Sequence, residues 1–184
     1  LKVINWINGE ETDAGVNSWL KKYNPHTGEQ LNEVADSSTQ QIEQAVCIAK
    51  KAFIRWSETT PVARGQILFE FSKLMSLNSK ELAKSIALET GKPPADANGE
   101  VSAAIMQAQF LAGEGMRLNG KSLTSSMYGK TSFTTREPHG IVGLIVPANT
   151  PIANIAWKIF PALICGKAII LKASEDAPSV SILM

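Results

Sequence analysis

The sequence predicts an α/β fold in which a helical N-terminal region leads into the start of a parallel sheet. Apolar residues recur at three- and four-residue spacing between positions 42 and 111, the period of buried helix faces. Residues 141–146 and 168–172 are continuous apolar runs, typical of strands buried on both faces. Residues 151–164, which lie between them, have a helical pattern. Strand, helix and strand in roughly thirty residues predict a βαβ unit.

Composition narrows the class of partner. The 184 residues are 44% hydrophobic and 19% charged, as in an ordinary globular protein, and 18 basic against 17 acidic residues give a net charge of +1. We therefore expect a small-molecule partner, with no nucleic acid and no membrane. No apolar run approaches the roughly 18 residues of a membrane span, and the start lacks a signal peptide, so a cytoplasmic location is expected. Both chain ends are expected to be cut, since the first residue is Leu1 and the last lies in an apolar run.

The elements before residue 122 follow from local signals. Turn residues beside apolar ones predict short strands before residue 37. Four helices should follow. The first has an apolar face over residues 42–56, and the second begins at Thr60-Pro61 with its stripe over residues 67–75. The third is expected to be capped by Asn78 and stopped by Gly91, and the fourth to span residues 96–118. Residues 122–136 predict a polar hairpin turning at Gly129-Lys130.

Candidate functional residues follow the two apolar strands, because ligands of parallel sheets bind beyond the carboxyl ends of the strands. The first is Asn149, in a turn stiffened by Pro147 and Pro151. A fixed amide can donate to an oxygen that gains charge during attack on a carbonyl. In the alternative interpretation, which spacing alone favours, Asn149 or Thr150 caps the next helix.

Lys172 and Glu175 follow the second strand. A donor and an acceptor there could hold the hydroxyls of a nucleotide ribose. Alternatively, Glu175 only suits a helix start and Lys172 is only solvated. The sequence has no Gly-rich phosphate loop after either strand.

Longer motifs resemble the aldehyde dehydrogenase superfamily. They run in the family's order over nearly the whole chain, at residues 24–29, 52–56, 89–93, 140–151, 156–167 and 171–175. The resemblance implies a partial, Rossmann-like cofactor domain. Its N-terminal helical part would span residues 1–121, an oligomerisation hairpin residues 122–137, and the start of the NAD-binding core residues 138–184. A homodimer or homotetramer is implied for the full-length protein.

The resemblance also implies roles for single residues. Asn149 matches the asparagine that binds the oxyanion of a thiohemiacetal. Lys158 matches a lysine linked to proton movement, although it could equally be a charge on the outer side of a helix whose Trp157 faces the core. The positions that match cofactor contacts are the wall residues Ile145, Val146 and Pro147 and the ribose contacts Lys172 and Glu175. Glu175 would repel a 2′-phosphate, so NAD is favoured over NADP.

Two departures qualify the implied reaction. Ala148 stands where many relatives have an aromatic residue, which leaves the aldehyde substrate open. The family's nucleophilic cysteine and general-base glutamate lie beyond Met184, so the isolated chain is expected to be inactive.

The remaining reactive side chains are given no catalytic role. Cys47 and Cys165 are expected to be buried and inert, no metal site is expected, and His26 and His139 receive no role. The alternatives are an acylating or phosphate-releasing reductase of the same superfamily, and a non-catalytic structural or truncated chain.

Overall fold

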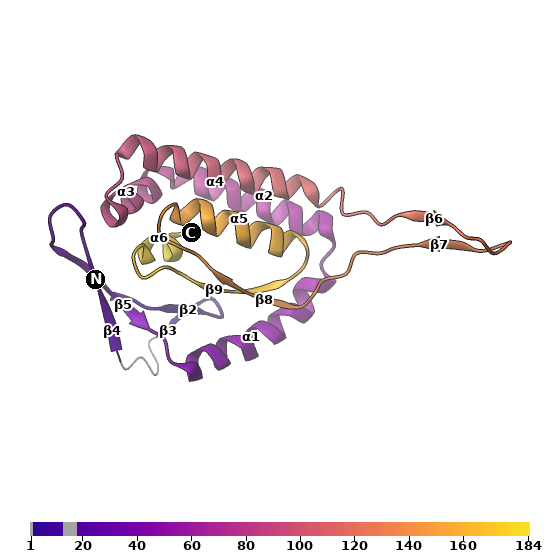
Figure 1. Ribbon diagram of the computed structural model, residues 1–184, viewed down its shortest axis with the longest axis horizontal. Helices are drawn as coiled ribbons and strands as arrows, with labels where there is room; N and C mark the ends of the chain where they lie inside the picture. Colours follow the sequence, from indigo (N-terminus) through magenta and orange to yellow (C-terminus); the bar gives the residue numbers. More distant parts are fainter. Residues whose placement is uncertain (1, 13–17) are drawn as a thin grey trace.

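The computed structural model describes residues 2–12 and 18–184 and has an α/β architecture (Figure 1). Short strands open the chain, as predicted: β1 (Lys2–Val3), β2 (Asn5–Ile7), β3 (Glu10–Thr12), β4 (Ser18–Tyr23) and β5 (Gln30–Asp36). Strands β1 and β4 both pair with β5, while β2 and β3 form a hairpin. Asn8 and Gly9 turn this hairpin with φ of 59° and 78°, a backbone region that Asn and Gly tolerate.

Four helices follow, at the positions that the sequence predicts: α1 (Thr39–Glu58), α2 (Pro61–Leu77), α3 (Ser79–Thr90) and α4 (Pro94–Glu114). Ser38 starts α1 through a capping box with Gln41. Thr60 starts α2, its hydroxyl accepting the Ala63 N–H. Gly91, with φ of 75°, ends α3 in the left-handed conformation.

Three helix boundaries differ from the prediction. The Asn78 side chain does not cap α3; its Nδ2 donates to the Leu74 carbonyl, 2.9 Å away, and so closes α2. Asn78 is the single residue between α2 and α3. Its side chain bonds a carbonyl in the last turn of α2 and not an N–H group in the first turn of α3. Helix α4 begins at Pro94, two residues earlier than expected, because proline fits a first turn whose N–H groups are not needed. It ends at Glu114 rather than near residue 118, beside Gly115.

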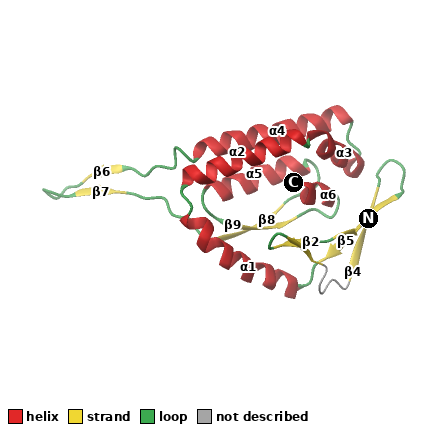
Figure 2. Cartoon of the chain, turned by 180° about the vertical axis from the view of Figure 1, so that it is seen from behind, coloured by secondary structure: helices red, strands yellow, loops and turns green. Residues whose placement is uncertain are grey.

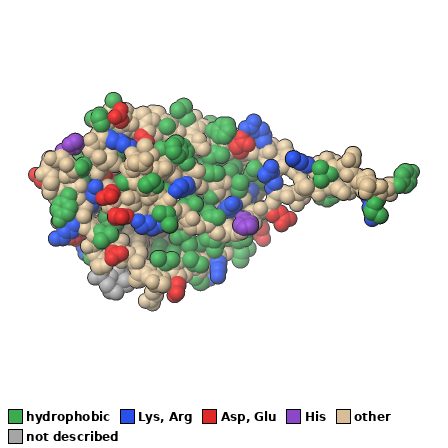
Figure 3. Space-filling model, in the orientation of Figure 1, with side chains coloured by type: hydrophobic (Ala, Val, Ile, Leu, Met, Phe, Trp, Pro, Cys, Tyr) green, Lys and Arg blue, Asp and Glu red, His purple; other side chains and the backbone are tan. Residues whose placement is uncertain are grey.

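The core lies between α2, α4 and α5 (Pro151–Ile164). Glycines allow α2 and α4 to approach closely, since a Cβ on Gly65 would lie 2.4 Å from the Ala112 carbonyl oxygen. Leu68 and Met75 of α2 are buried here. Ile67 and Leu74, expected on the same buried face, are exposed, because the elements packed on α2 cover only the side that carries Leu68. Hydrophobic side chains are accordingly visible over the surface in Figure 3.

The βαβ unit consists of β8 (Ile141–Ile145), α5 and β9 (Ala168–Lys172), followed by the short α6 (Pro178–Leu183). Strands β8 and β9 are parallel, as predicted. Figures 1 and 2 show α5 on one face of this strand pair and α1 on the other. The pair is therefore covered on both sides, which explains why its sequence is apolar throughout.

The polar segment forms the predicted hairpin, with β6 (Ser122–Thr124) antiparallel to β7 (Thr131–Phe133). It projects away from the helices, and its strand residues are all exposed (Figure 1). Among the described residues, every helix is too short or too polar to cross a bilayer.

Candidate functional site

The two candidate segments leave the sheet at the same edge. In the parallel register Ile145 lies opposite Lys172, so both strands end side by side. One further backbone hydrogen bond, 3.3 Å from Val146 N–H to the Lys172 carbonyl, ties the start of the two loops together. The structure thus brings the segment that carries Asn149 and the segment that carries Glu175 to one edge, where open parallel sheets bind ligands.

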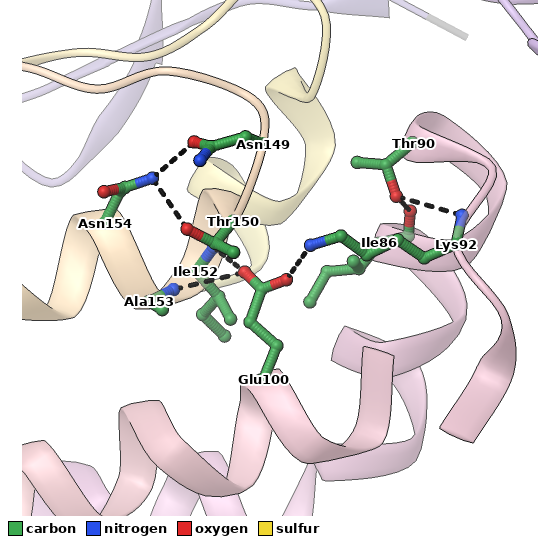
Figure 4. A network of polar contacts seen from close by, with 9 residues as sticks. All are labelled: Ile86, Thr90, Lys92, Glu100, Asn149, Thr150, Ile152, Ala153 and Asn154. Carbon is green, nitrogen blue, oxygen red and sulfur yellow. Dashed lines mark hydrogen bonds and ion pairs between the residues drawn. The ribbon is translucent and has the colours of Figure 1, made fainter. Parts of the chain in front are cut away.

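The N-terminus of α5, directly after Asn149, is capped from another helix. The Ile152 and Ala153 N–H groups donate to Glu100 Oε1 at 2.9 and 3.3 Å (Figure 4). Among the described residues, the N-cap Thr150 makes no capping bond through its side chain. The α4 carboxylate therefore takes the role that the sequence offered to Asn149 or Thr150.

Glu100 is also paired with a cation. Its Oε2 accepts a hydrogen bond from Lys92 Nζ, and the side chains are 6% and 22% exposed respectively. A buried carboxylate needs both a counter-charge and donors to offset its lost hydration. Lys92 supplies the charge and α5 supplies the donors, assisted by the positive end of the helix dipole. The Asn149 turn thus adjoins a helix start fixed by a buried ion pair.

The Asn149 side chain is held by its carbonyl end. Asn154 Nδ2 donates to Asn149 Oδ1 at 3.0 Å and to Thr150 Oγ1 at 2.9 Å (Figure 4). The Asn149 amide nitrogen is then the end that Asn154 leaves for other acceptors. Since Asn149 is exposed, this N–H₂ group is accessible to a ligand at the sheet edge.

Lys158 also faces the strand end. Its Nζ donates to the Ile145 carbonyl oxygen, so the side chain lies over β8 and not on the outer side of α5. The alternative in which Trp157 faces the core is wrong, because Trp157 is 54% exposed. Helical period orders the residues around the helix but does not say which side meets the sheet.

The three predicted wall residues occupy different environments. Ile145 is 70% exposed and Pro147 is exposed, so both side chains are available to a ligand. Val146 is 3% exposed and belongs to the core, so it can offer only backbone atoms.

Lys172 and Glu175 form an exposed pair, with Nζ 2.6 Å from Oε2. The hydrogen bond from Lys172, backbone hydrogen bonding and the charge of the ammonium all lower the pKa of the Glu175 carboxyl. Glu175 therefore remains an ionised acceptor at neutral pH, next to a cationic donor. A vicinal diol fits such a pair, because one hydroxyl can accept from Lys172 while the other donates to Glu175.

A second buried carboxylate serves the helix after β9. Glu89 of α3 accepts the Ser179 N–H at 3.1 Å and the Asn32 side-chain amide at 3.1 Å. The helices that follow β8 and β9 therefore both receive a carboxylate from the α3–α4 region.

The N–H groups of Ile152 and Ala153 at the start of α5 are bonded to Glu100, so they are not available to bind a ligand phosphate.

Two expectations about other reactive side chains need correction. Cys47 is exposed on α1 and not buried, because the strand pair contacts only the neighbouring face of that helix; Cys165 is partly buried. His26, for which the sequence indicates no role, lies with Nε2 2.8 Å from the Gly91 carbonyl oxygen and so holds the loop before β5 against the end of α3. Within residues 2–12 and 18–184, no cluster of His, Cys, Asp and Glu has the arrangement of a metal site.

Comparisons with known proteins agree with this architecture. A model of the aldehyde dehydrogenase family matches residues 11–184. A malonate-semialdehyde dehydrogenase of Listeria monocytogenes serotype 4b is 37% identical over 177 residues, which are 96% of this chain and 36% of that protein. An NADP-dependent enzyme of E. coli superposes with a TM-score of 0.95 at 31% identity over 98% of this chain and 38% of that one. A betaine aldehyde dehydrogenase point mutant of Staphylococcus aureus, solved with NAD⁺, gives 0.94 at 26% identity over 98% and 37%.

Proposed function

The chain belongs to the aldehyde dehydrogenase family, and from that premise we propose that it is the N-terminal part of an enzyme that oxidises an aldehyde to a carboxylic acid. The chain spans 36% of the length of the curated relative, so the activity proposed is that of the full-length protein. The observation that carries the proposal is the Asn149 amide, bound through its oxygen to Asn154 at the carboxyl edge of β8 and β9.

Asn149 acts as an oxyanion donor. A cysteine thiolate outside this chain attacks the aldehyde carbonyl and forms a thiohemiacetal, while the carbonyl oxygen gains negative charge. Asn149 Nδ2 donates to that oxygen. A preorganised donor of this kind contributes about 2.7–4 kcal/mol to the transition state, because it needs no reorientation as charge develops.

Lys158 lies where it could hold a proton near the reacting centre. Its ammonium is anchored on the Ile145 carbonyl, at the end of the strand that leads to Asn149. We assign it to proton movement during release of the acid by water. The neighbouring Ala148 leaves more room at the substrate entrance than an aromatic side chain would.

The cofactor proposed is NAD, which supplies the hydride acceptor when bound. Lys172 and Glu175 contact the adenosine ribose, and Ile145 and Pro147 line the cofactor wall together with the backbone of Val146. The ionised Glu175 disfavours a 2′-phosphate, although the similarity to an NADP-dependent enzyme keeps NADP as a testable second cofactor.

The remaining features belong to the full-length assembly. We assign the exposed β6–β7 hairpin to oligomerisation in a homodimer or homotetramer, and the protein to the cytoplasm. Residues 1–121 and 138–184 are assigned to the cofactor domain, with residues 122–137 as the oligomerisation segment. Malonate semialdehyde, named for the curated relatives, is the first aldehyde to assay.

The test is formation of NADH on addition of aldehyde. The full-length protein should reduce NAD in the presence of malonate semialdehyde or another short aldehyde, and should release the matching acid. The purified 184-residue chain, used as a control, should produce no NADH, because the cysteine proposed as the nucleophile lies outside it. Aldehyde-dependent NADH from the chain alone, or none from the full-length protein with any aldehyde of a broad panel, contradicts the proposal.

A further inference from the structure

We propose that Asn154 is a positioning residue that decides which end of the Asn149 amide faces the reacting carbonyl. The inference rests on the proposed function and adds to it a residue of α5. Its observation is the pair of hydrogen bonds that Asn154 Nδ2 donates, to Asn149 Oδ1 and to Thr150 Oγ1 (Figure 4).

The orientation of an amide matters because its two ends have nearly the same shape and opposite hydrogen-bonding character. The nitrogen of Asn149 would stabilise an oxyanion, whereas its oxygen would repel one. Asn149 is exposed, so packing alone does not choose between the two ends. The nitrogen of Asn154 can only donate, and it therefore binds the oxygen of Asn149 and leaves the nitrogen free to act.

The backbone around Asn154 is fixed by hydrogen bonds to Glu100 and to Thr150. Its neighbour Ala153 is buried and donates its N–H to Glu100 Oε1 at 3.3 Å. The Asn154 N–H itself bonds the Thr150 carbonyl at 2.9 Å, in the first turn of α5. The buried Glu100 thus fixes the first turn of α5, which carries Asn154. The side chain of Asn154 in turn fixes the orientation of the Asn149 amide through its hydrogen bond.

The sharpest test is Asn154→Asp in the full-length enzyme, because it keeps the shape and reverses the hydrogen bond. An ionised carboxylate only accepts, so it would bind Asn149 Nδ2 and turn Oδ1 toward the oxyanion. We expect kcat to fall about a hundredfold, the loss that accompanies removal of one oxyanion donor. KM for NAD should stay within about twofold, since the cofactor contacts lie elsewhere. Asn154→Leu, which abolishes both interactions without reversing either, should cost only about tenfold.

Two further measurements separate positioning from a general structural effect. Relative to wild type at each pH, the kcat of Asn154→Asp should recover as pH falls through the pKa of the introduced carboxyl, because the protonated acid can donate again. In an Asn149→Ala background, Asn154→Asp should change kcat less than about threefold, since the residue it orients is gone. Asn98→Asp is the matched control: Asn98 is an exposed residue of α4 whose Nδ2 bonds the Pro94 carbonyl, and its replacement should leave kcat unchanged.

The outcomes are distinguishable. An active wild-type enzyme in which Asn154→Asp leaves kcat within about threefold overturns this inference alone, as does an equal loss with and without Asn149. A wild-type protein that oxidises no aldehyde defeats the proposed function, and the inference falls with it.

Discussion

Asn149→Ala in the full-length enzyme should lower kcat about a hundredfold or more, because the change removes the donor proposed for the developing oxyanion. The helix that follows should survive, since its first N–H groups bond Glu100 and not Asn149. The midpoint of thermal unfolding should therefore stay within a few degrees of wild type. Steady-state kinetics with saturating NAD and aldehyde, together with a thermal melt, provide the measurement.

The control for this prediction is Asn98→Ala. It removes an exposed asparagine of α4 that bonds Pro94 and not the Asn149 turn, and it should leave kcat unchanged. If Asn149→Ala retains full turnover but loses stability, Asn149 has a structural role and is not an oxyanion donor.

Glu100→Leu should lower the free energy of unfolding by about 3–5 kcal/mol, the range for breaking a buried ion pair by removing one partner. The change leaves the Lys92 ammonium without its carboxylate and removes the acceptor of two helix N–H groups. Because Lys92 remains 22% exposed and can recover some hydration, the lower end of the range is expected. Urea denaturation of the full-length protein measures the loss.

Glu70→Leu provides the matched control, because Glu70 also bonds a lysine, Lys73, but on the surface of α2. Exposed pairs of this kind contribute about 0–1 kcal/mol, so Glu70→Leu should change the free energy of unfolding very little. Equal losses for Glu100→Leu and Glu70→Leu would show that the cap on α5 does not stabilise the fold.

The sequence predicts the elements whose signals are local. The βαβ boundaries follow from continuous apolar runs and from Pro151, and the start of α2 follows from Thr60-Pro61. The parallel register then brings the segments after β8 and β9 to one edge, as the βαβ interpretation requires. The arrangement of the βαβ unit depends on the secondary structure of its strands and helix, which residues close together in the sequence determine.

The contacts that fix the site come from distant parts of the chain, and the sequence did not indicate them. Glu100 lies 52 residues from Ile152, and Glu89 lies 90 residues from Ser179. At the other end of α5, Arg64 Nε donates to the Ile164 carbonyl at 3.0 Å across 100 residues. The only available signal was that Glu89 and Glu100 recur on the inner faces of helices, where an ionisable residue needs a partner.

The rotation of α5 was another feature that the sequence left undecided. Period places Trp157 and Lys158 about 100° apart, but the packing of α5 on β8 decides which of them meets the sheet. The sequence left both arrangements open, and the structure places Lys158 there. Asn154 was overlooked for a related reason, because its partner Asn149 lies in a turn whose path could not be derived from period.

The structure of the full-length protein with NAD bound tests the central claim most directly, namely that Asn149 and the Lys172–Glu175 pair serve one ligand at one sheet edge. The account predicts the adenosine ribose within hydrogen-bonding distance of Lys172 Nζ and the Glu175 carboxylate, with the Asn149 amide nitrogen facing the nicotinamide end of the same crevice. A cofactor bound at the opposite edge of β8 and β9, or one that leaves both Lys172 and Glu175 in solvent, would contradict it.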